Sequence, residues 1–145
     1  RRLNAKSRKY GYTPLHCAVG ANRIEAVKFL IEQKAALDQA AKDGETILHL
    51  ACSIRPYDDE PADSRIRMVA LLLELGAGAV INQRGGYELD TPLTLAVSDD
   101  DVDCVKLLLK HKADPTVQDA NGETALAIAE DEGWSELVTL LEGTR

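Results

Sequence analysis

The stretch TPLHCAVGANRIEAVKFL, residues 13–30, decides the fold, because its pattern returns three more times along the chain. Its opening Thr-Pro-Leu-His recurs as TILH, TPLT and TALA, starting at residues 46, 91 and 124. Its closing EAVKFL recurs as RMVALL, DCVKLL and ELVTLL, starting at residues 67, 103 and 136. The chain therefore contains four copies of one unit, and a fixed period of this length is typical of repeat architectures.

The copies are 33 residues apart, except that 45 residues separate the second from the third. Nine of the extra residues lie inside repeat two, in CSIRPYDDEPADSR (52–65), and three lie in the connection after it. Two prolines and several acids argue against a helix over most of this insertion, which we place near residues 53–63. Loop insertions cost little stability and often carry function, so it is either a tolerated surface loop or a partner contact.

Each copy predicts a pair of helices. Thr is a favourable N-cap and Pro a favourable first helical residue, so Thr13-Pro14 and Thr91-Pro92 mark helix starts. A short apolar helix follows, and after a turn a second helix carries apolar residues at helical spacing, as in IEAVKFL (24–30). Polar connectors with turn glycines join each pair to the next.

The third connector, AVINQRGGYELD (79–90), departs from this pattern. Leu89 stands where the other connectors have a turn glycine, so its path cannot be transferred from them. We expect Gly85-Gly86 to form the tip of this connector.

These features resemble the ankyrin-repeat family in four respects: the TPLH opening, the 33-residue period, the paired helices and the connector KADPTVQDANGET (112–124). The resemblance covers essentially the whole chain. It implies an all-α repeat solenoid, in which helix-turn-helix units stack and each connector forms a β-hairpin finger. It also implies a protein-binding scaffold, since most such arrays use the fingers and inner helices as a recognition groove.

We expect a single ankyrin-repeat domain over residues 1–145. Its expected parts are a basic lead-in, three repeats and a C-terminal capping repeat, at residues 1–9, 10–41, 42–86, 87–119 and 120–145. A cap is indicated by Glu130, which stands where the earlier repeats have an apolar residue. The lead-in is either the finger of an earlier repeat or a frayed tail, so we expect a monomer or part of a larger chain.

Composition and charge exclude several classes of protein. The net charge is −7, but residues 1–24 hold six basic residues and no acid, which leaves −13 on the remainder. An acidic body with only 4% aromatic residues disfavours nucleic acid and favours a basic or mixed-charge protein partner. No apolar run approaches the ~20 residues that a membrane span needs. Three cysteines without paired spacing favour a reducing, intracellular setting, and we expect the cytoplasm rather than the nucleus.

The cysteines and histidines raise the question of a metal site or a Cys-His nucleophile. By alignment Cys17 takes the place of leucine or isoleucine in the other repeats, and Cys52 and Cys104 also fall on apolar positions. We expect all three to be core residues. His16 and His49 occupy the fourth position of the TPLH motif, where the resemblance implies hydrogen bonds within the stack. We therefore expect no catalytic residue, no metal site, no cofactor and no enzymatic activity.

The resemblance implies that the residue before each motif Thr faces the groove. Three of these four residues are acidic. Further acids end the inner helices, and tyrosines near the fingers could anchor a partner. The expected partner-binding residues are Tyr10, Tyr12, Asp43, Glu45, Tyr87, Glu88, Asp90, Asp99, Asn121, Glu123 and Asp131. The acids form either a strip that attracts a basic partner or only a solvated face.

The leading hypothesis is a non-catalytic scaffold that binds a basic or mixed-charge protein segment in its groove. One alternative is the regulatory or targeting domain of a larger multidomain enzyme or signalling protein. Another is a reader of histone tails, in which Trp134 would belong to an aromatic cage rather than cover the open end of the stack.

Overall fold

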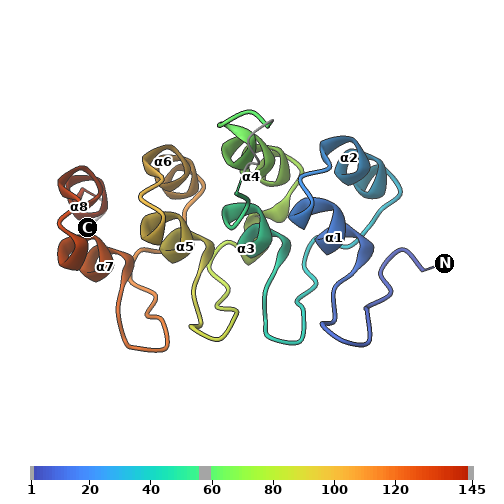
Figure 1. Cartoon of the computed structure of the whole chain (residues 1–145), viewed down its shortest axis with the longest axis horizontal. Coiled ribbons are helices and arrows are strands. Elements are labelled where there is room, and N and C mark those ends of the chain that lie inside the picture. Colours follow the sequence, from blue (N-terminus) through green and yellow to red (C-terminus); the bar gives the residue numbers. More distant parts are fainter. Residues whose placement is uncertain (1, 56–59, 144–145) are drawn as a thin grey trace.

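The computed structural model describes residues 2–55 and 60–143. Over these ranges the chain forms helix pairs that stack side by side, with a loop projecting to one side before each pair (Figure 1). The helices are α1 (Pro14–Gly20), α2 (Ile24–Glu32), α3 (Ile47–Cys52), α4 (Ser64–Glu74), η1 (Ala77–Val80), α5 (Pro92–Ser98), α6 (Val102–Lys110), α7 (Ala125–Glu132) and α8 (Ser135–Glu142). Helices α1, α3, α5 and α7 pack on one another in an inner row, and α4, α6 and α8 form an outer row. The expected solenoid of stacked helix pairs is confirmed.

Every inner helix begins at the predicted threonine. Thr13, Thr46, Thr91 and Thr124 are the N-caps of α1, α3, α5 and α7. In α1, α5 and α7 the threonine hydroxyl oxygen accepts a hydrogen bond from the backbone N–H three residues later, which satisfies a donor at the helix start. In the described part of the chain, no helix is long and apolar enough to cross a membrane.

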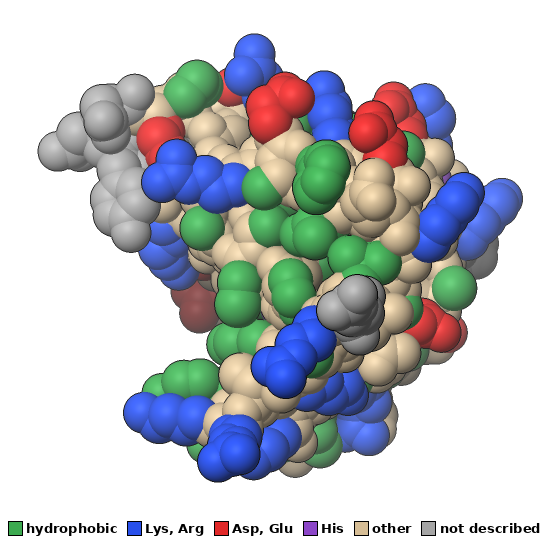
Figure 2. All heavy atoms as spheres, turned by 90° about the vertical axis from the view of Figure 1, so that its right-hand side faces the viewer, with side chains coloured by type: hydrophobic (Ala, Val, Ile, Leu, Met, Phe, Trp, Pro, Cys, Tyr) green, Lys and Arg blue, Asp and Glu red, His purple; other side chains and the backbone are tan. Residues whose placement is uncertain are grey.

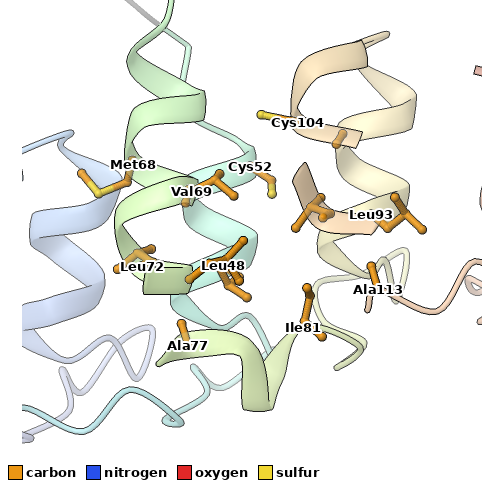
Figure 3. Close-up of a cluster of buried hydrophobic side chains, with 14 of the residues drawn as sticks. Leu48, Cys52, Met68, Val69, Leu72, Ala77, Ile81, Leu93, Cys104 and Ala113 are labelled. Carbon is orange, nitrogen blue, oxygen red and sulfur yellow. The ribbon is translucent and has the colours of Figure 1, made fainter. Parts of the chain in front are cut away.

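The core lies between successive helix pairs and is built from equivalent positions of the repeats. Leu15, Leu48 and Leu93 are each at most 1% exposed. Figure 3 shows Leu48 beside Val69 and Leu72 of α4, and Leu93 on the neighbouring helix pair of the next repeat. Ala51 and Ala96 are fully buried, where close helix packing needs a small residue. Because neighbouring repeats share this core, each repeat depends on the next for its stability.

The loops between helix pairs are hairpin-like fingers rather than pairs of regular strands. In the second finger the backbone N–H of Ala41 donates to the carbonyl of Glu45 at 2.8 Å. In the third, the N–H of Gly85 donates to the carbonyl of Asp90 at 2.8 Å, and these two residues form an isolated antiparallel bridge. The fingers therefore keep the shape of a hairpin with very few backbone pairs.

Backbone hydrogen bonds also join each finger to the one before it. The donor and acceptor pairs are Lys42 to Tyr10 (2.9 Å), Gly86 to Asp43 (2.9 Å) and Ala120 to Glu88 (2.8 Å). Asn4 Oδ1 accepts from the N–H of Ala36 at 2.8 Å, just as Asn82 Oδ1 accepts from the N–H of Asp114 at 2.7 Å. Residues 2–12 are thus not a frayed tail; they form the first of the laterally bonded fingers in the described part of the chain.

The third finger departs from its expected shape. Gly85-Gly86 is not the tip, because Gly85 is buried against the second finger, where an added Cβ would lie 2.5 Å from the carbonyl oxygen of Gly44. The tip lies further on, at Tyr87, whose side chain is 95% exposed. Leu89 adopts a φ of 53° where the other fingers have glycines at 76° to 91°. The leucine therefore keeps the left-handed turn, at a cost of about 1–2 kcal/mol.

The insertion of repeat two joins α3 to α4, and its residues 56–59 lie outside the described ranges. Ile54, near its start, is 5% exposed and belongs to the core. Near its end, the N–H and the hydroxyl of Ser64 both donate to the carbonyl of Pro61, at 3.1 and 2.6 Å. Part of the insertion is therefore structural, and a shortening over residues 54–62 would remove a core side chain.

Candidate protein-binding groove

Figure 2 views the stack from its N-terminal end and shows a hollow on the left, between the projecting first finger below and the helices above. One position of each inner helix remains at least partly accessible to solvent. The residues at this position are Cys17, Leu50, Leu95 and Ile128. Solenoids of this kind use such an extended surface for binding, so the fingers and inner helices frame the candidate groove.

In the second and third fingers, the residue before the N-cap threonine is held in place by a histidine of the preceding repeat. His16 Nε2 donates to the carbonyl of Glu45 at 3.3 Å, and His49 Nε2 donates to the carbonyl of Asp90 at 2.7 Å. In both histidines Nδ1 accepts a backbone N–H from the N-cap threonine, which leaves the ring proton on Nε2. The hydrogen-bonding role of the two histidines is confirmed. The bonds place Glu45 and Asp90 at matching positions of successive fingers.

Tyr12 and Glu45 contact each other at the first two fingers. The Tyr12 hydroxyl donates to a Glu45 carboxylate oxygen at 3.1 Å. Burial, and then the Glu45 charge, raise the pKa of Tyr12 to about 12, while burial and the nearby Asp43 raise the pKa of Glu45. The Tyr12 ring stacks between Tyr10 and His16, with ring centroids 5.7 and 5.6 Å away. This stack fixes Tyr12 and leaves Tyr10 half exposed at the groove edge.

The third and fourth fingers present carboxylates that no basic side chain pairs with in the described residues. Burial raises the pKa of Asp90, whose Oδ1 accepts a hydrogen bond from Thr94 Oγ1 at 3.0 Å. Asp131 on α7 lies close enough to Glu123 of the fourth finger to raise the pKa of the Glu123 carboxyl. Two carboxyls this close repel each other when both are ionised. A cation placed between them would relieve the repulsion.

The remaining expected contact residues lie at the fingertips. Tyr87, Glu88 and Asn121 are exposed there. Asp43 also stabilises its own turn, because its Oδ1 accepts the backbone N–H of Glu45 at 3.0 Å. The fingertip set is therefore available to a ligand, and its role in binding stays a prediction.

Asp99 differs from the other expected acids because arginines already pair with it. Its carboxylate lies 3.1 Å from Arg55 and 3.2 Å from Arg65, and Arg65 also lies 3.1 Å from Asp101. Arg65 Nε donates to the carbonyl of Ile54 at 2.9 Å. We call Arg55, Arg65, Asp99 and Asp101 the arginine clasp. Sequence reasoning missed it, although Arg55 near the start of the insertion and Arg65 just after its end were a signal that this segment could be charge-paired.

Cys17 contradicts the expectation that all three cysteines are core residues. Cys17 is exposed. It lies on the solvent-accessible side of α1, and the equivalent residues of the other inner helices are only partly buried. Cys52 and Cys104 are fully buried, as Figure 3 shows, and burial raises the pKa of Cys52 to about 12 and that of Cys104 above its ordinary value. A thiol held in its protonated form is a poor nucleophile and ligand. Among the described residues, no group of three or more His, Cys, Asp or Glu side chains is placed to hold a metal ion.

Serine substitutions should separate the exposed cysteine from the buried ones. We expect Cys52→Ser and Cys104→Ser each to lower the free energy of unfolding by about 1–3 kcal/mol, because a hydroxyl would enter an apolar site. Cys17→Ser should change it by less than about 0.5 kcal/mol. Urea denaturation measures these values, and in the native protein only Cys17 should react quickly with a thiol reagent. Equal destabilisation by all three substitutions would contradict the placement of Cys17.

Trp134 lies at the start of α8, half-buried against the core. With Asp100 and Val102 of the preceding repeat it lines a surface hollow of about 280 Å³. It therefore covers the junction between the last two repeats rather than the free end of the stack.

Comparisons with known proteins agree with this architecture. The Arabidopsis thaliana protein named "Putative E3 ubiquitin-protein ligase XBAT34" is 40% identical over 124 residues, which is 86% of this chain and 31% of that protein. Ankyrin repeat and SOCS box protein 11 of Mus musculus is 31% identical over 120 residues, or 83% of this chain and 33% of that protein. Inversin of Gallus gallus is 32% identical over 125 residues, or 85% of this chain and 10% of that protein.

The chain thus spans about a third or less of the length of these relatives. The family profile described as "Ankyrin repeats (3 copies)" matches residues 2–84 and 61–143, which together cover nearly the whole chain. This match agrees with the stacked helix pairs and the threonine-capped inner helices. The chain belongs to the ankyrin-repeat family.

Proposed function

We propose that this chain is a non-catalytic binding domain that takes an extended protein segment of basic or mixed charge into its groove. Ankyrin repeats typically mediate protein–protein interactions, and the groove acids supply the chemistry that selects a ligand here. The observation that carries the proposal is the geometry that holds Glu45 and Asp90 at matching positions of successive fingers, a position that Glu123 also occupies in the fourth finger. A lysine or arginine of a ligand would relieve the repulsion among these acids.

Glu45 and Asp90 extend this preference along the groove. Both carboxylates are partly desolvated, and burial raises the pKa of each, so both are held in a setting that disfavours their charge. A basic ligand would offset that penalty by forming pairs. Exposed pairs contribute only about 0–1 kcal/mol each, so the effect should appear mainly as faster association and strong salt dependence.

A variant that removes the groove charge tests the proposal. Glu45→Gln, Asp90→Asn and Glu123→Gln together keep a hydrogen-bond acceptor at each site and change the shape little. We expect association with a fluorescent lysine-rich peptide to slow by roughly tenfold at low salt and to lose most of its salt dependence. The melting temperature should stay level or rise, because partly desolvated charges have been removed.

The matched control carries the same charge change on the outer helices, as Glu74→Gln, Asp103→Asn and Glu136→Gln, all at exposed positions. It should change the association rate by less than about twofold, because these residues lie on the outer helices rather than on the fingers and inner helices. If the groove variant instead associates at the wild-type rate at low salt, the acids form only a solvated face.

A second candidate function is that of the partner-recruiting part of a larger protein. It is favoured by two of the relatives, which are named as a putative E3 ubiquitin-protein ligase and a SOCS box protein. The matched region makes up only about a third of each of them. The mass of the protein isolated from its natural source tests this. A mass well above the 15.8 kDa of this chain supports it, and a mass equal to that value contradicts it.

A further inference from the structure

The charge of the fingers changes sign along the stack. The first finger, residues 2–12, carries Arg2, Lys6, Arg8 and Lys9 and no acid. The fourth finger, residues 114–123, carries three acids and no basic residue, and three more acids, Glu130–Glu132, end the inner helix beside it. The two ends of the groove are therefore opposite in charge.

The basic residues of the first finger keep their charge free for a ligand. Lys6 Nζ donates to the backbone carbonyl of Ala40 at 2.7 Å, and Lys9 Nζ lies 4.8 Å from the centroid of the Tyr10 ring, so both contact neutral groups. Within residues 2–55 and 60–143, the basic side chains that form ion pairs are Lys28, Arg55, Arg65 and Arg67, none of which belongs to the first finger. Figure 2 shows Lys and Arg side chains on the first finger, at the lower edge of the hollow.

The first finger is also fixed in position, which a charged docking surface requires. The Lys42 side chain donates to the carbonyl of Arg8, and the Lys42 backbone N–H donates to the carbonyl of Tyr10 at 2.9 Å. The second finger thus holds the tip of the first and adds a cation to it. The ordering cost on binding is correspondingly smaller, because these backbone positions are already set.

We infer that the groove takes a polypeptide of two opposite charge blocks, with an acidic stretch against the first finger and a basic stretch against Glu123 and Asp131. This inference rests on the proposed function and deepens it, because it specifies the order of charges in the ligand and its direction along the groove. If the ligand bound in the opposite direction, its basic block would lie next to Lys6, Arg8 and Lys9 and would be repelled by them.

The length of the groove fixes the distance between the blocks. Packed helices lie about 8–10 Å apart, so three repeat steps span roughly 24–30 Å. An extended chain covers that span with about eight residues. At about 0.1 M salt the screening length is ~10 Å, so each end of the groove senses only the block that lies on it. A peptide whose charges alternate presents almost no net charge at either end.

Peptides of equal composition test the inference on the unaltered protein. The block peptide has four glutamates, a Gly-Ser spacer of about eight residues and four lysines. The alternating peptide has the same residues with the two charges interleaved, and a third peptide has the spacer and lysines only. We expect the block peptide to bind roughly fivefold more tightly than the alternating one at about 0.1 M salt, where each end of the groove senses only one block.

Direction is measured with the single tryptophan of the chain, Trp134, which lies in the last repeat. A dansyl group on the lysine end of the block peptide should accept energy from Trp134 strongly, and one on the glutamate end weakly. Equal transfer from both ends, or equal affinity of the block and alternating peptides, would overturn the inference. Self-association of the chain that the block peptide does not displace would also overturn it, since the occupant would then be a second copy.

Charge removal at the first finger gives the second measurement. Lys6→Gln, Arg8→Gln and Lys9→Gln together should lower the affinity for the block peptide to that of the alternating peptide, while the lysine-only peptide binds as before or better. The control Lys28→Gln, Lys106→Gln and Lys110→Gln on the outer helices should leave the difference between the peptides intact. If the lysine-only peptide binds but the block peptide gains nothing, the inference fails alone. If neither binds, the proposed function fails with it.

Discussion

Replacing His49 by alanine should lower the free energy of unfolding by about 3 kcal/mol. The His49 side chain is fully buried and bridges two repeats. Its Nε2 donates to the carbonyl of Asp90 at 2.7 Å, and its Nδ1 accepts the N–H of Thr46 at 3.0 Å. Alanine would leave the buried N–H of Thr46 without its acceptor, at about 1–3 kcal/mol. It would also remove one of the two hydrogen bonds to the carbonyl of Asp90, which keeps the bond from Gly85, and would add a cavity. Urea denaturation monitored by circular dichroism gives the value.

The third repeat supplies the control, because it has a threonine at the equivalent position. Thr94 Oγ1 accepts the N–H of Thr91 at 2.8 Å, so His49→Thr should restore the cap without reaching the next finger. We expect it to recover roughly half of the loss. His16→Ala should cost less than His49→Ala, since the His16 bond to the next finger is longer, at 3.3 Å. An alanine variant at His49 as stable as the wild type would show that the bridge does not stabilise the stack.

The same histidines give the stability a pH dependence of known sign. Burial lowers the pKa of His16 and of His49 below the ordinary value of 6.5. Below about pH 6.5 the unfolded chain therefore binds more protons at these histidines than the folded chain does. The free energy of unfolding is therefore highest above about pH 6.5 and falls as the pH decreases from there toward 5. His49→Thr should show a shallower slope over this window. Glu45 and Asp90, whose pKa values are raised, act in the opposite direction at the lower pH where carboxylates titrate.

The sequence was sufficient to predict those parts of the fold whose local signals recur in every repeat. Threonine caps, prolines at the first helical position and turn glycines recur in register, so each copy supports the assignment of the others. The positions of Glu45 and Asp90 followed from the same register. The third fingertip was misplaced because Leu89 adopts a backbone conformation that leucine rarely takes, and a pattern based on glycine cannot anticipate that.

Side-chain exposure and charge pairing were harder to predict, since both depend on neighbours in space. Cys17 aligns with Leu50, Leu95 and Ile128, but those residues are themselves only half-buried, so an apolar alignment did not imply a core position. Asp99 appeared available to a partner because its arginines come from the preceding repeat and its insertion. The sequence period shows which residues are equivalent in different repeats, but it does not show which side chains of neighbouring repeats contact each other.

Replacing Arg65 by alanine should destabilise the protein by about 3 kcal/mol, comparable to the loss of His49. Arg65 is 12% exposed and lies 3.2 Å from Asp99 and 3.1 Å from Asp101, which are themselves 22% and 25% exposed. Its Nε also holds the carbonyl of Ile54, so one side chain joins the insertion of repeat two to the helix turn of repeat three. Without it, Asp99 would keep only its ion pair with the exposed Arg55, and Asp101 would keep none, among the residues that the structure describes. Removing one partner of a buried ion pair costs more than the pair contributes, because the remaining charge is left uncompensated.

Arg55→Ala is the matched control, because it removes an arginine from the same clasp at a side chain that is 77% exposed. It should cost no more than about 1 kcal/mol. If the large effect of Arg65→Ala arises from uncompensated charge, Asp99→Asn in the Arg65→Ala background should recover part of the stability, although the same change destabilises the wild type. The sign of that double-mutant coupling decides between charge and packing. A further loss of stability in the double variant would mean that Arg65 acts through its packed stem, and that the clasp is not an electrostatic joint between the repeats.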